Sequence, residues 1–229
     1  MPIFNEKDNL SRLESELVKF INSTVFETKV LLINDGSTDG GEDIINEICK
    51  KNDFFESISF IKNSGLSSAL KAGFDLCNSE YIGYIDADLQ TSPSDFHILL
   101  KYIDQYDLVT GHRSKRKDSY LKNISSLVAN GIRNIFTNDG VNDTGCPLKV
   151  IKTGFAKRIP MFKGLHRFLP AMILLQKGKI IEVPVKHFPR IAGKSKFGLF
   201  NRILGPLYDC FAFIWMKRKY INYQIKDNE

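Results

Sequence analysis

Tyr81-Ile82-Gly83-Tyr84-Ile85-Asp86-Ala87-Asp88-Leu89-Gln90 carries the clearest signal in the chain, because an apolar run leads directly into two carboxylates. The run is apolar on consecutive positions, which is typical of a strand buried on both faces. Asp is depleted in strands, so Asp86 and Asp88 mark the strand's end. Two explanations are open. Either the pair and the side-chain carbonyl of Gln90 bind Mg²⁺ or Mn²⁺, or the carboxylates form Asp turns that cap the strand.

The chain around this stretch alternates between helix-like and strand-like segments. Helices are expected at residues 6–22, 40–51, 66–77, 94–104 and 121–136, and strands at 29–33, 57–61, 81–85 and 107–110. This order predicts an α/β fold with a mainly parallel, Rossmann-like sheet flanked by helices. After about residue 137 the alternation breaks down, and one further strand is expected at 179–185. Ligands of such sheets bind beyond the carboxyl ends of the strands, where Asp35 and Asp86 fall.

Length and composition bound the class of protein. The 229 residues, 43% of them hydrophobic and 11% aromatic, can bury one substantial core, which excludes a disordered or fibrous protein. The four cysteines lie far apart without a C-x-x-C pair, and no signal peptide precedes the first polar segment. A reducing, cytoplasmic setting is therefore expected.

The net charge of +6 is concentrated at the C-terminal end. Residues 186–229 hold nine basic and three acidic residues, so the first 185 residues are neutral overall. The same segment is rich in aromatic residues, which suits an anionic surface. Its longest apolar stretch, residues 207–216, is interrupted by Asp209 and is too short to span a bilayer.

Three interpretations of this tail are open: a helix in the membrane interface, a helix packed on the domain, and a solvated basic helix. We expect a domain at residues 1–197 and an amphipathic, membrane-interfacial segment at 198–229. Nucleic acid is not an expected partner, because the basic residues are mixed with a continuous apolar stretch.

A second acidic motif follows the expected strand at 29–33, in the stretch Ile33-Asn34-Asp35-Gly36-Ser37-Thr38-Asp39-Gly40. A turn followed by a helix cap at Thr38 or Asp39 explains most of this stretch. Asp35 is the residue that this local structure does not explain. At a strand's carboxyl end, its carboxylate can accept hydrogen bonds from a nucleoside base or ribose.

Taken in order along the chain, these motifs resemble those of family 2 glycosyltransferases of the GT-A fold. The resemblance rests on the two acidic motifs and on four further stretches: Pro2-Ile3-Phe4-Asn5-Glu6, Gly111-His112-Arg113, Asp143-Thr144-Gly145-Cys146-Pro147-Leu148-Lys149, and Glu182-Val183-Pro184-Val185 leading to Arg190 and Gly193-Lys194-Ser195-Lys196. The last three look like those of dolichol-phosphate mannosyltransferases and bacterial polyprenyl-phosphate glycosyltransferases. The resemblance covers essentially the whole chain.

The resemblance implies a role for each matching position. It assigns nucleotide binding to Pro2, Phe4, Glu6, Ile33, Asp35, Asp86 and Ala87, and metal binding to Asp86, Asp88 and Gln90. It assigns catalysis, through the metal and the phosphate-binding cations, to Asp88, Arg113, Arg190 and Lys196. It places Lys122, Ser126 and Lys149 beside the acceptor phosphate, although Lys122 stands where the family has Arg and lacks the bidentate fork.

The chain departs from the family pattern at its beginning. Family members have a hydrophobic strand ahead of the first motif, whereas only Met1 precedes Pro2 here. Phe4 replaces a Tyr and keeps the ring without its hydroxyl. Asn34 replaces the first of two Asp, and its side chain is expected to point away from the ligand.

The second half of the chain is rich in cations and poor in candidate bases. His112, His166 and His187 have no evident carboxylate partner in sequence, and each is expected to be structural or phosphate-facing. A hydroxyl acceptor needs a general base, whereas a phosphate acceptor already carries an anionic oxygen at neutral pH. The arrangement therefore favours a phosphate acceptor.

The resemblance and the residues together predict an inverting, metal-dependent hexosyltransferase. It would move one sugar from GDP-mannose or a UDP-hexose to a polyprenyl (dolichyl or undecaprenyl) phosphate, as a peripheral protein on the cytosolic face of the membrane. Two alternatives remain: transfer to a hydroxyl of a glycan or lipopolysaccharide, and a non-catalytic module that binds nucleotide sugars or membranes.

Overall fold

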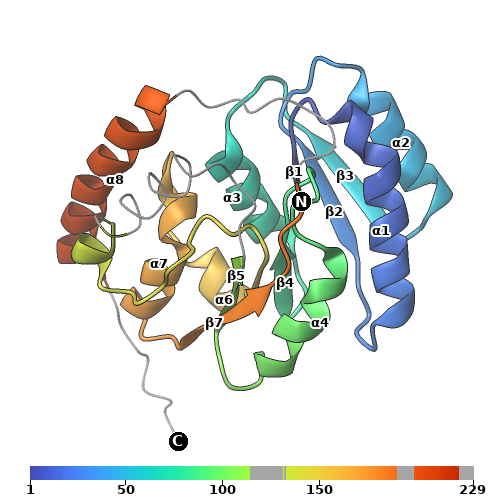
Figure 1. Cartoon of the computed structure of the whole chain (residues 1–229). Coiled ribbons are helices and arrows are strands. Elements are labelled where there is room, and N and C mark those ends of the chain that lie inside the picture. The colour runs from blue at the N-terminus through green and yellow to red at the C-terminus, as the bar shows by residue number, and fades with distance from the viewer. Residues whose placement is uncertain (114–130, 132, 190–198, 222–229) are drawn as a thin grey trace, which may run out of the picture.

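The computed structural model describes residues 1–113, 131, 133–189 and 199–221, which form helices around two sheets (Figure 1). The strands are β1 (Pro2–Ile3), β2 (Val30–Asn34), β3 (Phe55–Ser59), β4 (Tyr81–Tyr84), β5 (Leu108–Arg113), β6 (Lys149–Lys152) and β7 (Ile180–Val185). The helices are α1 (Leu10–Ser23), α2 (Gly41–Lys51), α3 (Leu66–Leu76), α4 (Phe96–Leu99), α6 (Thr153–Lys157), α7 (Leu169–Leu175) and α8 (Leu199–Lys219), with short 3-10 turns η1 (Lys7–Asn9), η2 (Pro93–Asp95), η3 (Leu100–Tyr102) and η4 (Leu165–Phe168).

The first sheet has the order β1-β2-β3 and is parallel throughout. Residues 30–34 of β2 pair with residues 55–59 of β3, whereas β1 pairs only with the last two residues of β2. Parallel pairing requires long crossover connections, which α1 and α2 supply here. The fold class predicted from the alternation of the segments is therefore confirmed.

The second sheet has the order β4-β6-β5-β7 and contains an antiparallel strand that the sequence analysis missed. Strand β6 lies between β4 and β5 and runs against both, while β5 and β7 are parallel. The carboxyl ends of β4 and β5 therefore meet at one edge, together with the amino end of β6. This edge brings Asp86, Arg113 and Lys149 into one region.

Two hydrophobic clusters cover opposite faces of the sheets. One joins side chains of α1, α2 and α4 to alternate strand residues such as Val109 and Val150. The other joins α3, α6, α7 and α8 to the intervening residues, such as Leu108 and Ile151. This alternation is the ordinary period of two along a strand, and it shows that the second sheet is buried on both sides.

One predicted strand is displaced along the chain, and the helix expected at 94–104 is interrupted: only Phe96–Leu99 is α-helical, with η2 before it and η3 after it. The strand expected at 57–61 lies at Phe55–Ser59, because the buried Phe55 pairs with Val30 while Ile61 is fully exposed at 105%. The helix expected at 121–136 lies largely outside the described residues, although residues 133–137 are helical.

Candidate active site

Residues 86–90 follow β4, and we call them the acidic loop. Burial has the largest effect on the pKa of its first carboxylate. Asp88 is buried, and its Oδ1 accepts a hydrogen bond from the backbone N–H of Gln90 at 3.2 Å. Burial, followed by the nearby carboxylate of Asp88, raises the pKa of Asp86 to about 6. Two carboxylates thus share a region that disfavours their combined charge, which is the situation that a bound cation relieves.

Three contacts fix the shape of this loop. The Tyr84 hydroxyl donates to Asp86 Oδ1 at 2.8 Å, so the strand itself orients the first carboxylate. Leu89 has a φ of 50°, a left-handed conformation that is uncommon for a residue with its side chain, and it is held there by burial. The Gln90 carbonyl accepts from the Phe188 N–H at 2.9 Å, which ties the loop to the segment after β7.

Asp35 occupies the equivalent position after β2, but the protein itself satisfies its carboxylate. Oδ1 accepts from the Ser64 N–H at 2.7 Å, and Oδ2 accepts from Asn63 Nδ2 at 2.8 Å and from the Gly65 N–H at 2.9 Å. The carboxylate therefore holds the loop that leads into α3. Its predicted contact with a nucleotide would be additional to this role and stays a prediction.

The motif at residues 2–6, called the first motif here, is joined by hydrogen bonds to the turn after β2. Asn5 Oδ1 accepts from the Thr38 N–H at 2.8 Å, and Asp39 Oδ2 accepts from the Lys7 N–H at 2.9 Å. Phe4 and Glu6 are half-buried beside this junction, whereas the side chain of Ile33 lies in the core. The structure thus brings the two motifs predicted to bind the nucleotide into contact with each other.

Asn34 behaves as expected for a residue that faces away from a ligand. It is buried, its Oδ1 accepts from the Ser37 N–H at 3.0 Å, and its Nδ2 donates to Ser59 Oγ at 3.2 Å. Both ends of the amide are thus engaged in the turn and in β3.

Arg113, the last residue of β5, forms a nearly buried bidentate ion pair with Asp143. Its Nε and Nη2 donate to the two carboxylate oxygens, each at 2.7 Å, and its backbone N–H donates to Oδ2 at 3.2 Å. This fork geometry fixes the guanidinium plane, which Lys could not do. A side chain at Gly145 would place its Cβ 3.1 Å from Nη2, so the small residue leaves room for the pair.

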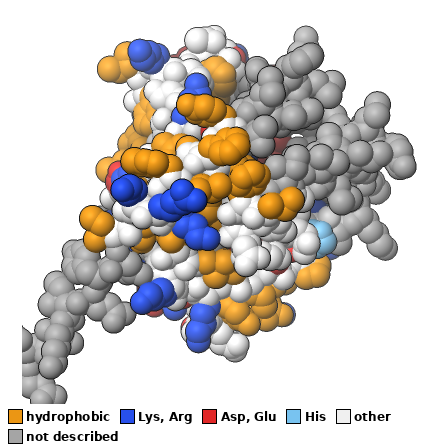
Figure 2. Space-filling view, turned by 90° about the vertical axis from the view of Figure 1, so that its left-hand side faces the viewer, with side chains coloured by type: hydrophobic (Ala, Val, Ile, Leu, Met, Phe, Trp, Pro, Cys, Tyr) orange, Lys and Arg blue, Asp and Glu red, His pale blue; other side chains and the backbone are white. Residues whose placement is uncertain are grey.

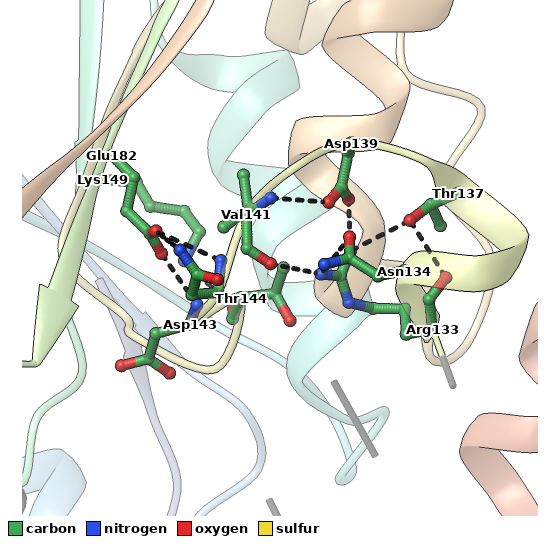
Figure 3. A network of polar contacts seen from close by, with 10 residues as sticks. Arg133, Asn134, Thr137, Asp139, Val141, Asp143, Thr144, Lys149 and Glu182 are labelled. Carbon is green, nitrogen blue, oxygen red and sulfur yellow. Dashed lines mark hydrogen bonds and ion pairs between the residues drawn. The ribbon is translucent and has the colours of Figure 1, made fainter. Parts of the chain in front are cut away.

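Asp143 is in turn positioned by Glu182 on β7. Glu182 Oε1 accepts from the Asp143 N–H at 2.7 Å, and Oε2 accepts from the Asn142 N–H at 3.1 Å. Figure 3 shows Glu182 against the Asp143 backbone, with the Asp143 carboxylate pointing away from it. These two acids stand in stretches that the sequence analysis singled out, but their pairing is long-range and was not predicted.

A second buried ion pair supports the same loop from the other side. Arg133 donates to the Asp139 carboxylate and to the Val141 carbonyl, the latter at 2.8 Å. In Figure 3 the loop runs between this pair and Glu182. The loop that holds Arg113 is therefore braced at both ends.

Lys149 lies beneath the loop rather than on its surface. Its side chain is fully buried on β6, and its Nζ donates to the carbonyl of Cys146 and, at 3.3 Å, to that of Thr144. Burial lowers the pKa of Lys149. These contacts are those of a residue that supports the loop, and its predicted contact with the acceptor phosphate stays a prediction.

His166 lies in η4 and contacts α3. His166 Nδ1 lies 2.8 Å from Ser67 Oγ, and burial, followed by Arg167, lowers the pKa of His166 to about 3. His166 is thus a neutral residue between α3 and η4. His112 is half-buried on β5.

Four predicted site residues, Lys122, Ser126, Arg190 and Lys196, lie outside the described residues. Among the residues that are described, no group of three or more His, Cys, Asp or Glu side chains could hold a metal ion. The predicted metal set needs only two carboxylates, with Gln90 as third ligand. The electrostatic effects on Asp86 extend to Lys149 and Arg113, both of which lower its pKa, so these cations lie within reach of the acidic loop.

Fold and site define the class: an α/β protein of the GT-A type with a carboxylate pair at the sheet edge. The family described as "Glycosyl transferase family 2" matches residues 1–158. The chain belongs to this family, which confirms the resemblance drawn from its motifs.

Two curated relatives carry the comparison over most of the chain. Undecaprenyl-phosphate 4-deoxy-4-formamido-L-arabinose transferase from Edwardsiella ictaluri is 30% identical over 91% of this chain and 65% of its own length. Dodecaprenyl-phosphate galacturonate synthase from Rhizobium johnstonii is 28% identical over 95% of this chain and 66% of its own length. The chain thus spans about two thirds of the length of these relatives.

Solved structures support the fold. Glucosyl-3-phosphoglycerate synthase from Mycobacterium tuberculosis, in complex with Mn²⁺, uridine diphosphate and glucosyl-3-phosphoglycerate, matches with a TM-score of 0.68. The match covers 95% of this chain and 76% of that chain at 13% sequence identity.

Proposed function

We propose that this protein transfers one sugar from a nucleoside-diphosphate sugar to a polyprenyl phosphate, with inversion at the anomeric carbon, in a reaction that requires Mg²⁺ or Mn²⁺. The observation that carries the proposal is the carboxylate pair of Asp86 and Asp88 at a sheet edge that also holds the Arg113–Asp143 ion pair. Both curated relatives are named for polyprenyl-phosphate sugar chemistry, which supports this choice of acceptor.

The donor set of the acidic loop fits a hard divalent cation. Asp86 and Asp88 supply carboxylate oxygens and Gln90 a neutral carbonyl oxygen, which Mg²⁺ and Mn²⁺ prefer over nitrogen or sulfur. So few protein ligands leave coordination positions for a diphosphate. When bound, the ion would offset the negative charge that develops on the departing nucleoside diphosphate.

Residues of the chain itself would bind the nucleotide and hold cations near the acidic loop. The first motif and the turn after β2, joined through Asn5 and Asp39, would form the nucleotide pocket. Arg113, fixed by Asp143, presents a cation near the acidic loop without conformational search, and such preorganised charge is the main source of electrostatic catalysis. Arg190 and Lys196 are proposed to add further cations.

The shortage of bases supports a phosphate acceptor. His166 stays neutral in its buried contact with Ser67, so it does not resemble a base poised near neutral pH. A phosphate monoester brings its own anionic oxygen to the anomeric carbon. We therefore favour the polyprenyl phosphate over a hydroxyl of a glycan or lipopolysaccharide.

Helix α8 is proposed to hold the protein at the cytosolic face of the membrane. Its inner side chains Cys210, Phe213 and Met216 are buried, and Phe213 stacks on Phe168 with ring centroids 5.4 Å apart. Its outer side exposes Tyr208, Phe211 and Trp215 by 78%, 57% and 68%. The helix thus packs on the domain, and the apolar stripe on its outer side supports the proposed contact with a membrane interface.

Charge accompanies this stripe. Lys217, Arg218 and Lys219 are exposed at the end of α8, and Figure 2 shows hydrophobic and basic side chains mixed on the face to which this helix belongs. Such a surface suits the interface of an anionic bilayer. No helix in the described part of the chain has the length and apolarity needed to cross a membrane.

The proposed reaction is tested by incubating the protein with labelled GDP-mannose or UDP-hexoses, Mn²⁺ and undecaprenyl phosphate. A sugar-lipid phosphate that disappears on chelation supports the proposal. Transfer to a glycan hydroxyl with no lipid product would establish the alternative acceptor. Donor binding without any product would establish a non-catalytic module.

The membrane proposal has its own test, flotation with vesicles of phosphatidylcholine with or without phosphatidylglycerol. We expect binding to the anionic vesicles, reduced at least about tenfold by the double variant Tyr208→Ser and Trp215→Ser. Val25→Ser is the matched control, since Val25 is 95% exposed on another part of the surface. Equal binding by all three proteins would contradict a role for α8.

A further inference from the structure

A pocket of about 180 Å³ is shared by α1 and the residues around the end of the acidic loop. Its walls include Arg12 and Glu16 of α1, Leu89 of the acidic loop, Thr91 and Phe188. A single water needs only about 15 Å³ of such space, so the pocket has room for a small polyatomic ion. We call it the Arg12–Thr91 pocket.

Two side chains on these walls bury a hydrogen-bond donor without an acceptor. Arg12 Nη1 and Thr91 Oγ1 are both enclosed by the protein, and neither has a hydrogen-bond partner within the described part of the chain. Thr91 as a whole is only 1% exposed. Since buried polar groups nearly always have a partner, two such groups on the walls of one pocket indicate a ligand that accepts hydrogen bonds.

The charges around the pocket favour an anion. Arg12 precedes Glu16 by four positions on α1, which is the less favourable order for an ion pair along a helix. Glu16 Oε1 instead accepts from Lys19 Nζ at 2.8 Å, so its second oxygen, Oε2, can accept from a ligand. Among the described residues that line the pocket, Arg12 and Glu16 are the charged ones, and with Lys19 they carry one net positive charge.

The pocket also adjoins the residues proposed to bind the metal. Leu89 and Thr91 flank Gln90 in the chain, and both line the pocket. The Gln90 carbonyl accepts from the N–H of Phe188, which forms another part of the wall. A ligand held by Arg12 and Thr91 would therefore join α1 to the acidic loop and restrict the movement of that loop.

We propose that the Arg12–Thr91 pocket binds free hydrogen phosphate, which orders the acidic loop. Phosphate oxygens would accept from the guanidinium of Arg12 and the hydroxyl of Thr91. The remaining P–OH would donate to Glu16 Oε2, which a carboxylate or a sulfate ion cannot do at neutral pH. A phosphate monoester has lost most of this proton at neutral pH, so the free ion fits the pocket better.

The experiment uses the full chain without metal, in EDTA, so its outcome does not depend on the proposed transfer reaction. Thermal unfolding is measured near neutral pH with sodium phosphate, sulfate, acetate, glycerol 3-phosphate or chloride at constant ionic strength. With a Kd of about 1 mM, about 10 mM phosphate should raise the Tm by about 4 °C. Sulfate and glycerol 3-phosphate should bind at least about fivefold more weakly, because each lacks the hydrogen bond to Glu16.

Hydrogen exchange reports on the acidic loop under the same conditions. Phosphate at about ten times its Kd should slow exchange of the amides at residues 88–92 by up to about tenfold, because the loop opens only after the ion has left.

Two variants test the assigned contacts. Arg12→Met keeps the aliphatic stem and removes the charge, so it should weaken phosphate binding at least about tenfold. Without phosphate its Tm should equal or exceed that of the wild type, because an unpartnered buried group has been removed. Thr91→Val keeps the side-chain shape and should weaken binding about fivefold. The exposed Lys101→Met is the matched control and should respond to phosphate as the wild type does.

Four results would overturn the proposal. A wild-type Tm that rises no more in phosphate than in chloride would show that water alone fills the pocket. An equal response of the wild type and Arg12→Met would place the phosphate elsewhere, such as the proposed diphosphate site. A stronger response to acetate that Arg12→Met abolishes would identify a carboxylate ligand. A stronger response to glycerol 3-phosphate, also lost in Arg12→Met, would identify a phosphate ester.

Discussion

Two aspartates follow buried strands in this protein, and the protein treats them differently. Asp35, after β2, receives three hydrogen bonds of 2.7 to 2.9 Å from residues 63–65. Asp86, after β4, receives one from Tyr84 and has its pKa raised to about 6 by burial and by Asp88. The hydrogen bonds to Asp35 stabilise the fold, whereas the repulsion between the carboxylates of Asp86 and Asp88 supports the proposal that this pair binds a cation.

The largest effect is expected for Asp88→Asn in the acidic loop, where a loss of activity can be separated from a loss of stability. Asp88→Asn removes a charge from the repelling pair, so the free energy of unfolding should stay equal or rise by up to about 1 kcal/mol. Transfer activity should fall by about 10³-fold, because the proposed cation loses a charged ligand. Activity assays and urea denaturation measure the two quantities. Asp104→Asn, at an exposed position, is the control.

The outcome that breaks the comparison is a destabilised Asp88→Asn protein that keeps its activity. Asp88 would then be a capping residue, which is the alternative that its sequence leaves open.

The next largest effect is expected at Arg113. Like Asp35, this residue is held by hydrogen bonds within the protein, but it lies near Asp86. Arg113→Lys keeps the charge and loses the fork to Asp143, so activity should fall by about 10²-fold while donor binding changes little. Steady-state kinetics would show the loss in kcat. Asp143→Asn should give a similar kcat if Asp143 acts by positioning Arg113. Wild-type kcat in both variants would mean that the ion pair serves folding alone.

The sequence predicted the parts of this site that depend on local pattern. The apolar run at 81–85 and the following carboxylates identified β4 and the acidic loop, because burial on both faces leaves a continuous apolar signal. Strand β6 was missed, since Lys149 and Lys152 enclose only two apolar residues and the strand is defined by its pairing with β4 and β5. Register with distant strands is not written in a local pattern.

The partners of the predicted residues were missed for a similar reason. Glu182 holds Asp143 from 39 positions away, and Asn63 reaches Asp35 from 28 positions away. A motif predicts which residues belong to the site, whereas their hydrogen-bond partners come from distant parts of the chain and depend on the fold.

A smaller effect is expected at Asp35, whose carboxylate accepts three hydrogen bonds from the protein. Asp35→Asn replaces a charged acceptor of three hydrogen bonds with an amide and sets an NH₂ group against a donor, so the free energy of unfolding should fall by about 2 kcal/mol. Urea denaturation gives this value, with the exposed Asp53→Asn as the matched control. If stability is unchanged and only nucleotide affinity falls, Asp35 belongs with Asp86 as a ligand-binding residue, and the contrast between them fails.

The smallest effect is expected at Tyr84, whose hydroxyl orients the carboxylate of Asp86. Tyr84→Phe removes the 2.8 Å hydrogen bond to Asp86 Oδ1 and leaves the ring in the core. Groups that orient metal-binding side chains typically contribute about tenfold to metal affinity. We therefore expect the concentration of Mn²⁺ at half-maximal activity to rise about tenfold, with saturating activity nearly restored. Activity that stays low at every Mn²⁺ concentration would place Tyr84 in the reaction itself. An unchanged Mn²⁺ dependence would mean that Asp86 needs no orientation from the strand, and that the neighbouring carboxylate of Asp88 distinguishes it from Asp35.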